Sequence, residues 1–161
     1  GTHLGDGLLW AAVGVLAYIL SGAQERRAIG AIALTVLAAG AIVSALKLLV
    51  RRQRPSRRHV SLYRCFDAYS FPSGHACRIF CLAVLFPSLQ PVSPIPLLLL
   101  ATWVSLSRVL LSVHHISDVL VGGVIGCLAG AWDDAFSRHL EFSASSGIIE
   151  IRDYRFLEKK P

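Results

Sequence analysis

The chain has 161 residues, of which 54% are hydrophobic and 16% are charged, with 16 lysine and arginine residues against 10 aspartate and glutamate residues. The apolar fraction excludes a disordered chain, and the charged fraction is well below the roughly 25% of an ordinary soluble domain. Because the length fits one domain, we expect residues 1–161 to form a single, all-α, multi-pass transmembrane helical bundle.

Five apolar segments predict membrane-spanning helices, since a helix needs about 20 mostly apolar residues to cross a bilayer. We expect spans at about 7–23, 28–50, 73–88, 94–112 and 116–136, followed by a polar tail at 137–161. The polar tetrapeptide QERR at 24–27 predicts a tight turn, and four prolines between 87 and 96 separate the third span from the fourth. Residues 148–151 of the tail fit either a short strand or an interfacial anchor.

Small side chains on the predicted spans indicate how the helices pack. Glycines 122, 123, 126 and 130 give the fifth span a small-xxx-small face of the kind that lets two membrane helices approach closely. Cysteines 65, 77, 81 and 127 lack the spacing of a metal site, and we interpret them as small buried thiols rather than ligands or disulfide partners.

Positive charge is concentrated in one stretch of the chain. Seven of the 16 basic residues lie between Lys47 and Arg64, and no acidic residue occurs between Glu25 and Asp67. Local charge of this kind favours a phosphate site over a general basic coat. The stretch has a single aromatic residue, Tyr63, so we expect no nucleic-acid binding.

Counting helices predicts where this charge lies. With five spans, the end of the second, the start of the third, the end of the fourth and the start of the fifth all fall on one membrane face. The N-terminus shares that face and the C-terminal tail lies opposite. Three clusters meet there: Lys47 with Arg54-Pro55; Pro72-Ser73-Gly74-His75; and Ser107-Arg108 with His114 and Asp118.

These residue types suit a phosphoryl group. Lysine and arginine supply fixed positive charge and several donors, while Ser73 and Gly74 add a hydroxyl and a close backbone approach at a helix N-terminus. Histidines transfer protons or attack as nucleophiles near neutral pH. His114 and Asp118 are four residues apart, so on a helix the carboxylate would orient the imidazole.

Each cluster also has a structural interpretation. Arginines at a membrane edge often face lipid headgroups, and that is our interpretation of arginines 51, 52, 57 and 58. The PSGH tetrapeptide at 72–75 is compatible with a helix N-cap and a turn. A lone His–Asp pair is usually structural. Their joint occurrence at converging helix ends favours a functional site.

The three clusters resemble the KxxxxxxRP, PSGH and SRxxxxxHxxxD motifs of the type 2 phosphatidic acid phosphatase (PAP2) superfamily, over residues 47–118. The flanking sequence DAYSFPSGHA at 67–76 is most similar to the presqualene and polyisoprenoid diphosphate phosphatase branch. Many relatives have six spans, whereas five are visible here. The resemblance implies a membrane phosphatase acting on a phosphorylated lipid substrate, either a monophosphate or a diphosphate, with no metal and no other cofactor.

The resemblance also implies residue roles. His114 attacks phosphorus to form a phosphohistidine, Asp118 orients His114, and His75 protonates the leaving oxygen. The remaining motif residues hold the phosphate and its transition-state charge; they are Lys47, Arg54, Ser73, Gly74 and Arg108. His115 points about 100° away from His114 on a helix and receives no role.

Two other functions are weighed against this one. A catalytically silent lipid-phosphate-binding or scaffold protein would not need the retained histidines, and vanadate-dependent haloperoxidases share the motifs but are large and soluble. We expect an integral membrane protein, in the endoplasmic reticulum if eukaryotic or the cytoplasmic membrane if prokaryotic. Relatives favour a lumenal or periplasmic site, although the positive-inside rule would place the basic 47–64 loop in the cytoplasm. The sequence leaves the oligomeric state undetermined.

Overall fold

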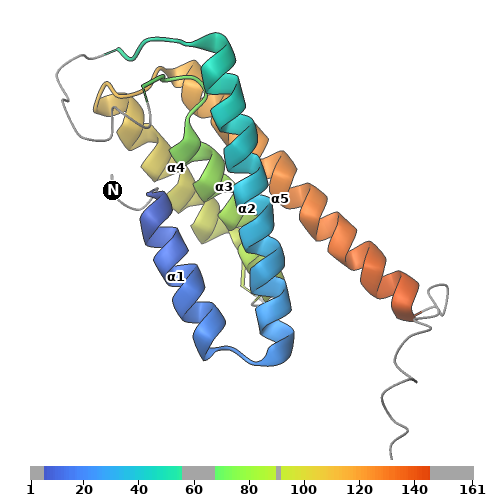
Figure 1. The fold of residues 1–161 in the computed structure, drawn as a ribbon. Coiled ribbons are helices and arrows are strands. Elements are labelled where there is room, and N and C mark those ends of the chain that lie inside the picture. Colours follow the sequence, from blue (N-terminus) through green and yellow to red (C-terminus); the bar gives the residue numbers. More distant parts are fainter. Residues whose placement is uncertain (1–5, 56–67, 90–91, 146–161) are drawn as a thin grey trace, which may run out of the picture.

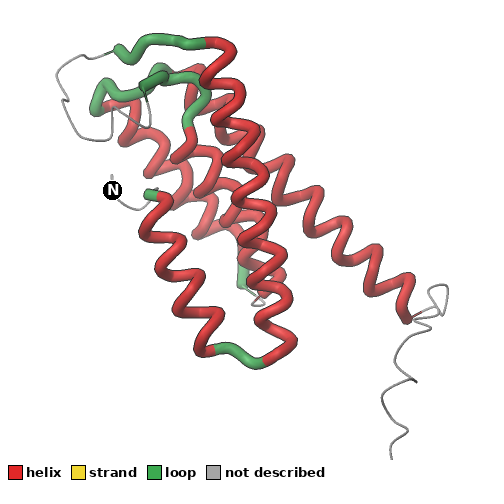
Figure 2. Tube along the Cα trace, viewed as in Figure 1, coloured by secondary structure: helices red, strands yellow, loops and turns green. Residues whose placement is uncertain are grey.

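The structure is a computed structural model that describes residues 6–55, 68–89 and 92–145. These residues form helices and loops with no strand (Figure 2), which confirms the predicted all-helical fold. The part of the tail at 148–151 lies outside the described residues. The five helices are α1 (Gly7–Leu20), α2 (Ala23–Val50), α3 (Gly74–Leu89), α4 (Pro94–Leu110) and α5 (Ile116–Ser145).

Helix α3 is the centre of the bundle. It packs against α2, α4 and α5, while α1 lies beside α2 as the other arm of a helical hairpin (Figure 1). The end of α2, the start of α3, the end of α4 and the start of α5 meet at the same end of the bundle. The predicted convergence of the motif-bearing helix ends is therefore present in the structure.

The predicted turn at 24–27 is wrong, because these residues form the first turn of α2. The polar side chains instead satisfy backbone groups at the two helix ends that face each other. The Gly22 amide donates to Glu25 Oε2 at 3.1 Å, and Arg26 Nε donates to the Tyr18 carbonyl at 2.9 Å. Helix ends leave such groups without partners within the helix. The polar tetrapeptide therefore lies inside α2, and its side chains stabilise the short connection between α1 and α2.

Two other boundaries differ from the prediction. Helix α5 continues past 136 to Ser145, where an Asp134–Arg138 ion pair spans one turn of the helix. Helix α4 starts at Pro94 as predicted, with the Ser93 hydroxyl accepting from the Ile95 amide, but it ends at Leu110. Proline in the first helical turn needs no hydrogen-bond partner for its nitrogen.

The glycines of α5 form a packing face, as the sequence predicted, and the helix that packs against this face is α3. A Cβ atom added at Gly122 would lie 2.3 Å from the Ser73 carbonyl oxygen, and one at Gly126 would lie 2.1 Å from the Cys77 carbonyl oxygen. Only a residue without a side chain allows this approach. Cys77 and Cys81 are buried free thiols, which confirms their interpretation, whereas Cys127 is a free thiol that is only partly buried. Cys65 lies outside the described residues.

Many large apolar side chains lie on the outer surface of the bundle, and several polar ones are buried among the apolar side chains of its interior. Leu49 and Trp132 are more than three-quarters exposed, whereas Ser70 and Asp118 are fully buried. Two helical stretches, Glu25–Val50 and Ile116–His139, are long and apolar enough to cross a membrane, and the other three helices are shorter and apolar. An apolar outer surface, with the ionisable side chains of His114 and Asp118 buried inside the bundle, is the arrangement expected in lipid.

Candidate active site

The site is formed where the four helix ends meet, and two loops complete it. Lys47 lies in the last turn of α2, His75 in the first turn of α3, Arg108 in the last turn of α4 and Asp118 in the first turn of α5. His114 lies between α4 and α5, and its backbone amide donates to the Arg108 carbonyl. Residues that are far apart in the sequence are thereby brought to one end of the bundle.

The His114 side chain is held in one orientation by a backbone carbonyl. It is 2% exposed, and its Nδ1 lies 2.8 Å from the Ser70 carbonyl oxygen. Because a carbonyl oxygen only accepts hydrogen bonds, Nδ1 carries the proton and Nε2 keeps its lone pair. Asp118 Oδ2 lies farther from Nδ1, at 3.7 Å. Asp118 therefore acts on His114 through its charge alone, and the Ser70 carbonyl accepts the hydrogen bond from Nδ1.

Asp118 makes its closest contacts elsewhere. Its Oδ1 accepts from Arg52 Nη1 at 2.8 Å and its Oδ2 accepts from the His115 amide at 2.9 Å. The carboxylate is fully buried, whereas the Arg52 side chain is 38% exposed. The headgroup interpretation of Arg52 is therefore wrong. A buried carboxylate requires a cation or several donors, and Arg52 meets that need.

Ser70 is a site residue that sequence reasoning missed. Its amide donates to the Arg52 carbonyl at 2.9 Å, and its hydroxyl donates to the Gln53 carbonyl at 3.1 Å. These bonds join the segment after α2 to the segment before α3 and fix the carbonyl that His114 meets. No residue type marks a functional backbone carbonyl, so the sequence offered no signal for it.

The PSGH segment acts as a helix start in the structure. Ser73 is fully buried, its amide donates to the Asp118 carbonyl at 2.8 Å, and its hydroxyl accepts from the Ala76 amide at 3.4 Å. The hydroxyl thus caps α3, in agreement with the structural interpretation. A contact between Ser73 and phosphate remains a prediction.

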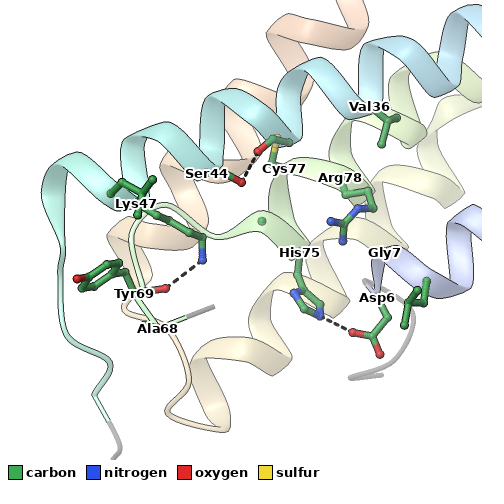
Figure 3. Close-up of a pocket in the computed structure, with 14 residues that line it drawn as sticks. Asp6, Gly7, Val36, Ser44, Lys47, Ala68, Tyr69, His75, Cys77 and Arg78 are labelled. Atoms are coloured by element: carbon green, nitrogen blue, oxygen red, sulfur yellow. Dashed lines mark hydrogen bonds and ion pairs between the residues drawn. The ribbon is translucent and has the colours of Figure 1, made fainter. Parts of the chain in front are cut away.

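A cavity of about 570 Å³ opens beside the helix ends, between α1, α2 and α3 (Figure 3). Three of the predicted residues line it, namely Lys47, Gly74 and His75. Lys47 Nζ donates to the Tyr69 carbonyl at 3.0 Å at one end of the cavity. His114 and Asp118 are not among its lining residues. Within the described ranges, no group of three or more His, Cys, Asp or Glu side chains is arranged to hold a metal ion.

Burial and positive charge keep His114 neutral. Burial, the largest effect, and the cations of Arg54, Lys47 and Arg108 together lower its pKa to about 3, although the hydrogen bond to the Ser70 carbonyl acts in the opposite direction. These three cations belong to the predicted phosphate-binding set. The arrangement places an unprotonated imidazole next to a concentration of positive charge, which is the environment that an anionic substrate needs.

The chain belongs to the PAP2 superfamily, which it matches over residues 28–134. It is 39% identical over 98 residues to the decaprenylphosphoryl-5-phosphoribose phosphatase of Mycobacterium tuberculosis, covering 60% of this chain and 54% of the relative. It is 30% identical over 99 residues to the lipid A 1-phosphatase of Rhizobium etli, and this match covers 57% of this chain and 43% of the relative. The chain therefore spans about half the length of these relatives.

Two crystal structures share the fold. A transmembrane PAP2-type phosphatidylglycerolphosphate phosphatase from Bacillus subtilis matches with a TM-score of 0.68 and 26% identity, over 86% of this chain and 73% of that one. LpxE from Aquifex aeolicus matches with a TM-score of 0.65 and 23% identity, over 82% of this chain and 79% of LpxE. The helical architecture is thus that of membrane-embedded PAP2 proteins.

Proposed function

We propose that this chain is a multi-pass integral membrane phosphatase that hydrolyses phosphate monoester or diphosphate groups of lipid substrates through a phosphohistidine on His114. The observation that carries the proposal is the state of His114. Its Nδ1–H is held by the Ser70 carbonyl, which leaves the lone pair of the neutral imidazole on Nε2, and burial together with three cations depresses its pKa. Curated relatives in the same superfamily are phosphatases of lipid-linked phosphates, which supports the substrate class.

The reaction follows from these contacts. The Nε2 lone pair forms a bond to phosphorus while the bond from phosphorus to the leaving oxygen breaks, and His75 gives a proton to that oxygen. The imidazole becomes positive as it is phosphorylated, and the buried Asp118 carboxylate, 3.7 Å from Nδ1, stabilises that charge. Lys47, Arg54 and Arg108 stabilise the phosphoryl oxygens. Water then attacks phosphorus and releases inorganic phosphate and free His114.

The location suits a lipid. The helix ends that carry the site lie at one end of an apolar bundle, so a phosphate headgroup would meet the cations at the interface while its hydrocarbon chain stays in the bilayer. We place this face on the lumenal or periplasmic side. Protease cleavage within residues 57–64 in sealed vesicles of known orientation tests that placement, and cleavage from the cytoplasmic side alone would contradict it.

The test of function is phosphate release by detergent-purified protein in the presence of EDTA. Farnesyl diphosphate and phosphatidic acid are compared for the parent, His114→Ala and the control His139→Ala, since His139 is exposed on α5. We expect release by the parent and the control and none by His114→Ala, with acid-labile, base-stable label on the parent from radioactive substrate. A folded parent that binds both lipids without turnover would favour a silent binding protein instead.

A further inference from the structure

An acidic side chain outside the predicted motifs reaches the site. Asp6 occupies the N-cap position of α1, yet its side chain makes no capping hydrogen bond with that helix. Aspartate at this position commonly accepts from its own helix, a bond worth about 1 kcal/mol. Here Asp6 Oδ1 lies 3.2 Å from His75 Nε2, and both side chains line the cavity (Figure 3). The carboxylate is directed to the histidine of α3 rather than to its own helix.

The charges around His75 give this contact a consequence. Arg78 on α3 and Arg108 on α4 act on the His75 ring, and Lys47 of α2 lines the same cavity. Burial and the two arginines oppose a positively charged imidazole, whereas the Asp6 carboxylate at hydrogen-bond distance favours it. Asp6 brings the opposing negative charge. A histidine that must donate a proton requires such a partner in cationic surroundings.

We propose that Asp6 is a positioning residue for His75: it accepts from Nε2–H, stabilises the imidazolium, and leaves Nδ1–H to protonate the leaving oxygen. This role rests on the proposed function. In the step, the Nδ1–H bond breaks and an O–H bond forms on the leaving oxygen, which has taken the electron pair of the broken P–O bond. Asp6 keeps Nε2–H throughout and touches neither substrate nor phosphorus.

The proposal predicts a dependence on the leaving group. A lipid monophosphate expels the oxygen of an alcohol, a poor leaving group that needs a proton as the bond breaks. A lipid diphosphate expels a phosphate monoester, which is stable as an anion and needs no proton. Loss of Asp6 should therefore slow monophosphate hydrolysis and spare diphosphate hydrolysis. A structural role in docking α1 would slow both substrates equally.

The experiment measures kcat and KM for farnesyl monophosphate and farnesyl diphosphate in detergent. The variants are Asp6→Asn, Asp6→Ser, which keeps an N-cap residue without the charge, His75→Gln and the double variant Asp6→Asn/His75→Gln. We expect both Asp6 variants to lower kcat about 10- to 100-fold on the monophosphate, a part of the 10²–10⁴ of general acid catalysis, and less than about threefold on the diphosphate. The double variant should have the same kcat on each substrate as His75→Gln alone.

The control is Asp134→Asn, which removes a carboxylate about four helical turns beyond Asp118 on α5 and should leave both rates unchanged. Equal losses on the two substrates, no loss on either, or additive losses in the double variant would each overturn the role of Asp6. A parent that hydrolyses neither lipid would overturn the proposed function, and this role with it. A parent active on both, with no selective effect of Asp6, would overturn this role alone.

Discussion

Replacing Gly126 by alanine tests whether the contact between α3 and α5 positions the site. The new Cβ would lie 2.1 Å from the Cys77 carbonyl oxygen, 2.9 Å from the carbonyl carbon and 3.0 Å from the Cys81 amide nitrogen. Two of these neighbours are closer than the 3.0 Å below which real Cβ contacts are essentially never found. All are backbone atoms that cannot rotate away, so α5 must move by about 0.9 Å, the difference between 3.0 and 2.1 Å.

That movement has a calculable cost. The Ser73 amide is 2.8 Å from the Asp118 carbonyl, and an equal displacement there would stretch this bond to about 3.7 Å, beyond hydrogen-bond distance. The lost bond costs about 1 kcal/mol and overpacking costs about 1–3 kcal/mol, while alanine returns about 1 kcal/mol of helix propensity. We expect a net destabilisation of about 2 kcal/mol.

The assay is thermal unfolding in detergent, followed by circular dichroism, with phosphate release measured on the same samples. For a chain of this size, about 2 kcal/mol lowers Tm by about 4–8 °C. The matched control is Gly30→Ala on α2, where an added Cβ meets nothing within 4 Å and alanine should raise Tm. If Gly126→Ala melts at or above the parent temperature, the close approach of the two helices does not hold the site together.

Two further predictions concern the charged groups of the site. Arg52→Gln leaves the buried Asp118 carboxylate without its cation. Because the Arg52 side chain is 38% exposed, we expect a loss of stability at the low end of the range for a broken buried pair, about 3 kcal/mol. The control Arg51→Gln, at an exposed neighbour, should change stability by less than about 0.5 kcal/mol, and equal Tm values for the two variants would contradict the Arg52–Asp118 pairing. The pKa of His114 is about 3 in the folded state and 6.5 ordinarily. The neutral imidazole therefore contributes folding stability that is fully present above pH 6.5 and is lost as the pH falls towards 3. The loss amounts to at most about 1.4 kcal/mol per pH unit. Unfolding measured between pH 4 and 7 should therefore show a shallower slope for His114→Gln than for the parent, and equal slopes would refute the buried neutral imidazole.

Helix number and order were predictable because they depend on local composition. An apolar run of sufficient length forms a helix in lipid, and prolines separate one run from the next. The glycine face of α5 was also visible, since its spacing of four residues is a property of one helix. The turn at 24–27 was mispredicted for a physical reason: polar side chains at a helix start satisfy its backbone groups as readily as they form a loop.

The sequence by itself determined which residue types meet at one end of the bundle, because consecutive spans run in opposite directions, so the end of one span and the start of the next lie on the same face. Only the tertiary structure decided which atoms pair there. Arg52 bonds to Asp118, the Ser70 carbonyl bonds to His114, and Asp6 bonds to His75, across 66, 44 and 69 residues of chain. Spacing along one helix sets directions around its own axis, whereas these partners depend on how closely α5 approaches α3 and on where the loops between helices cross.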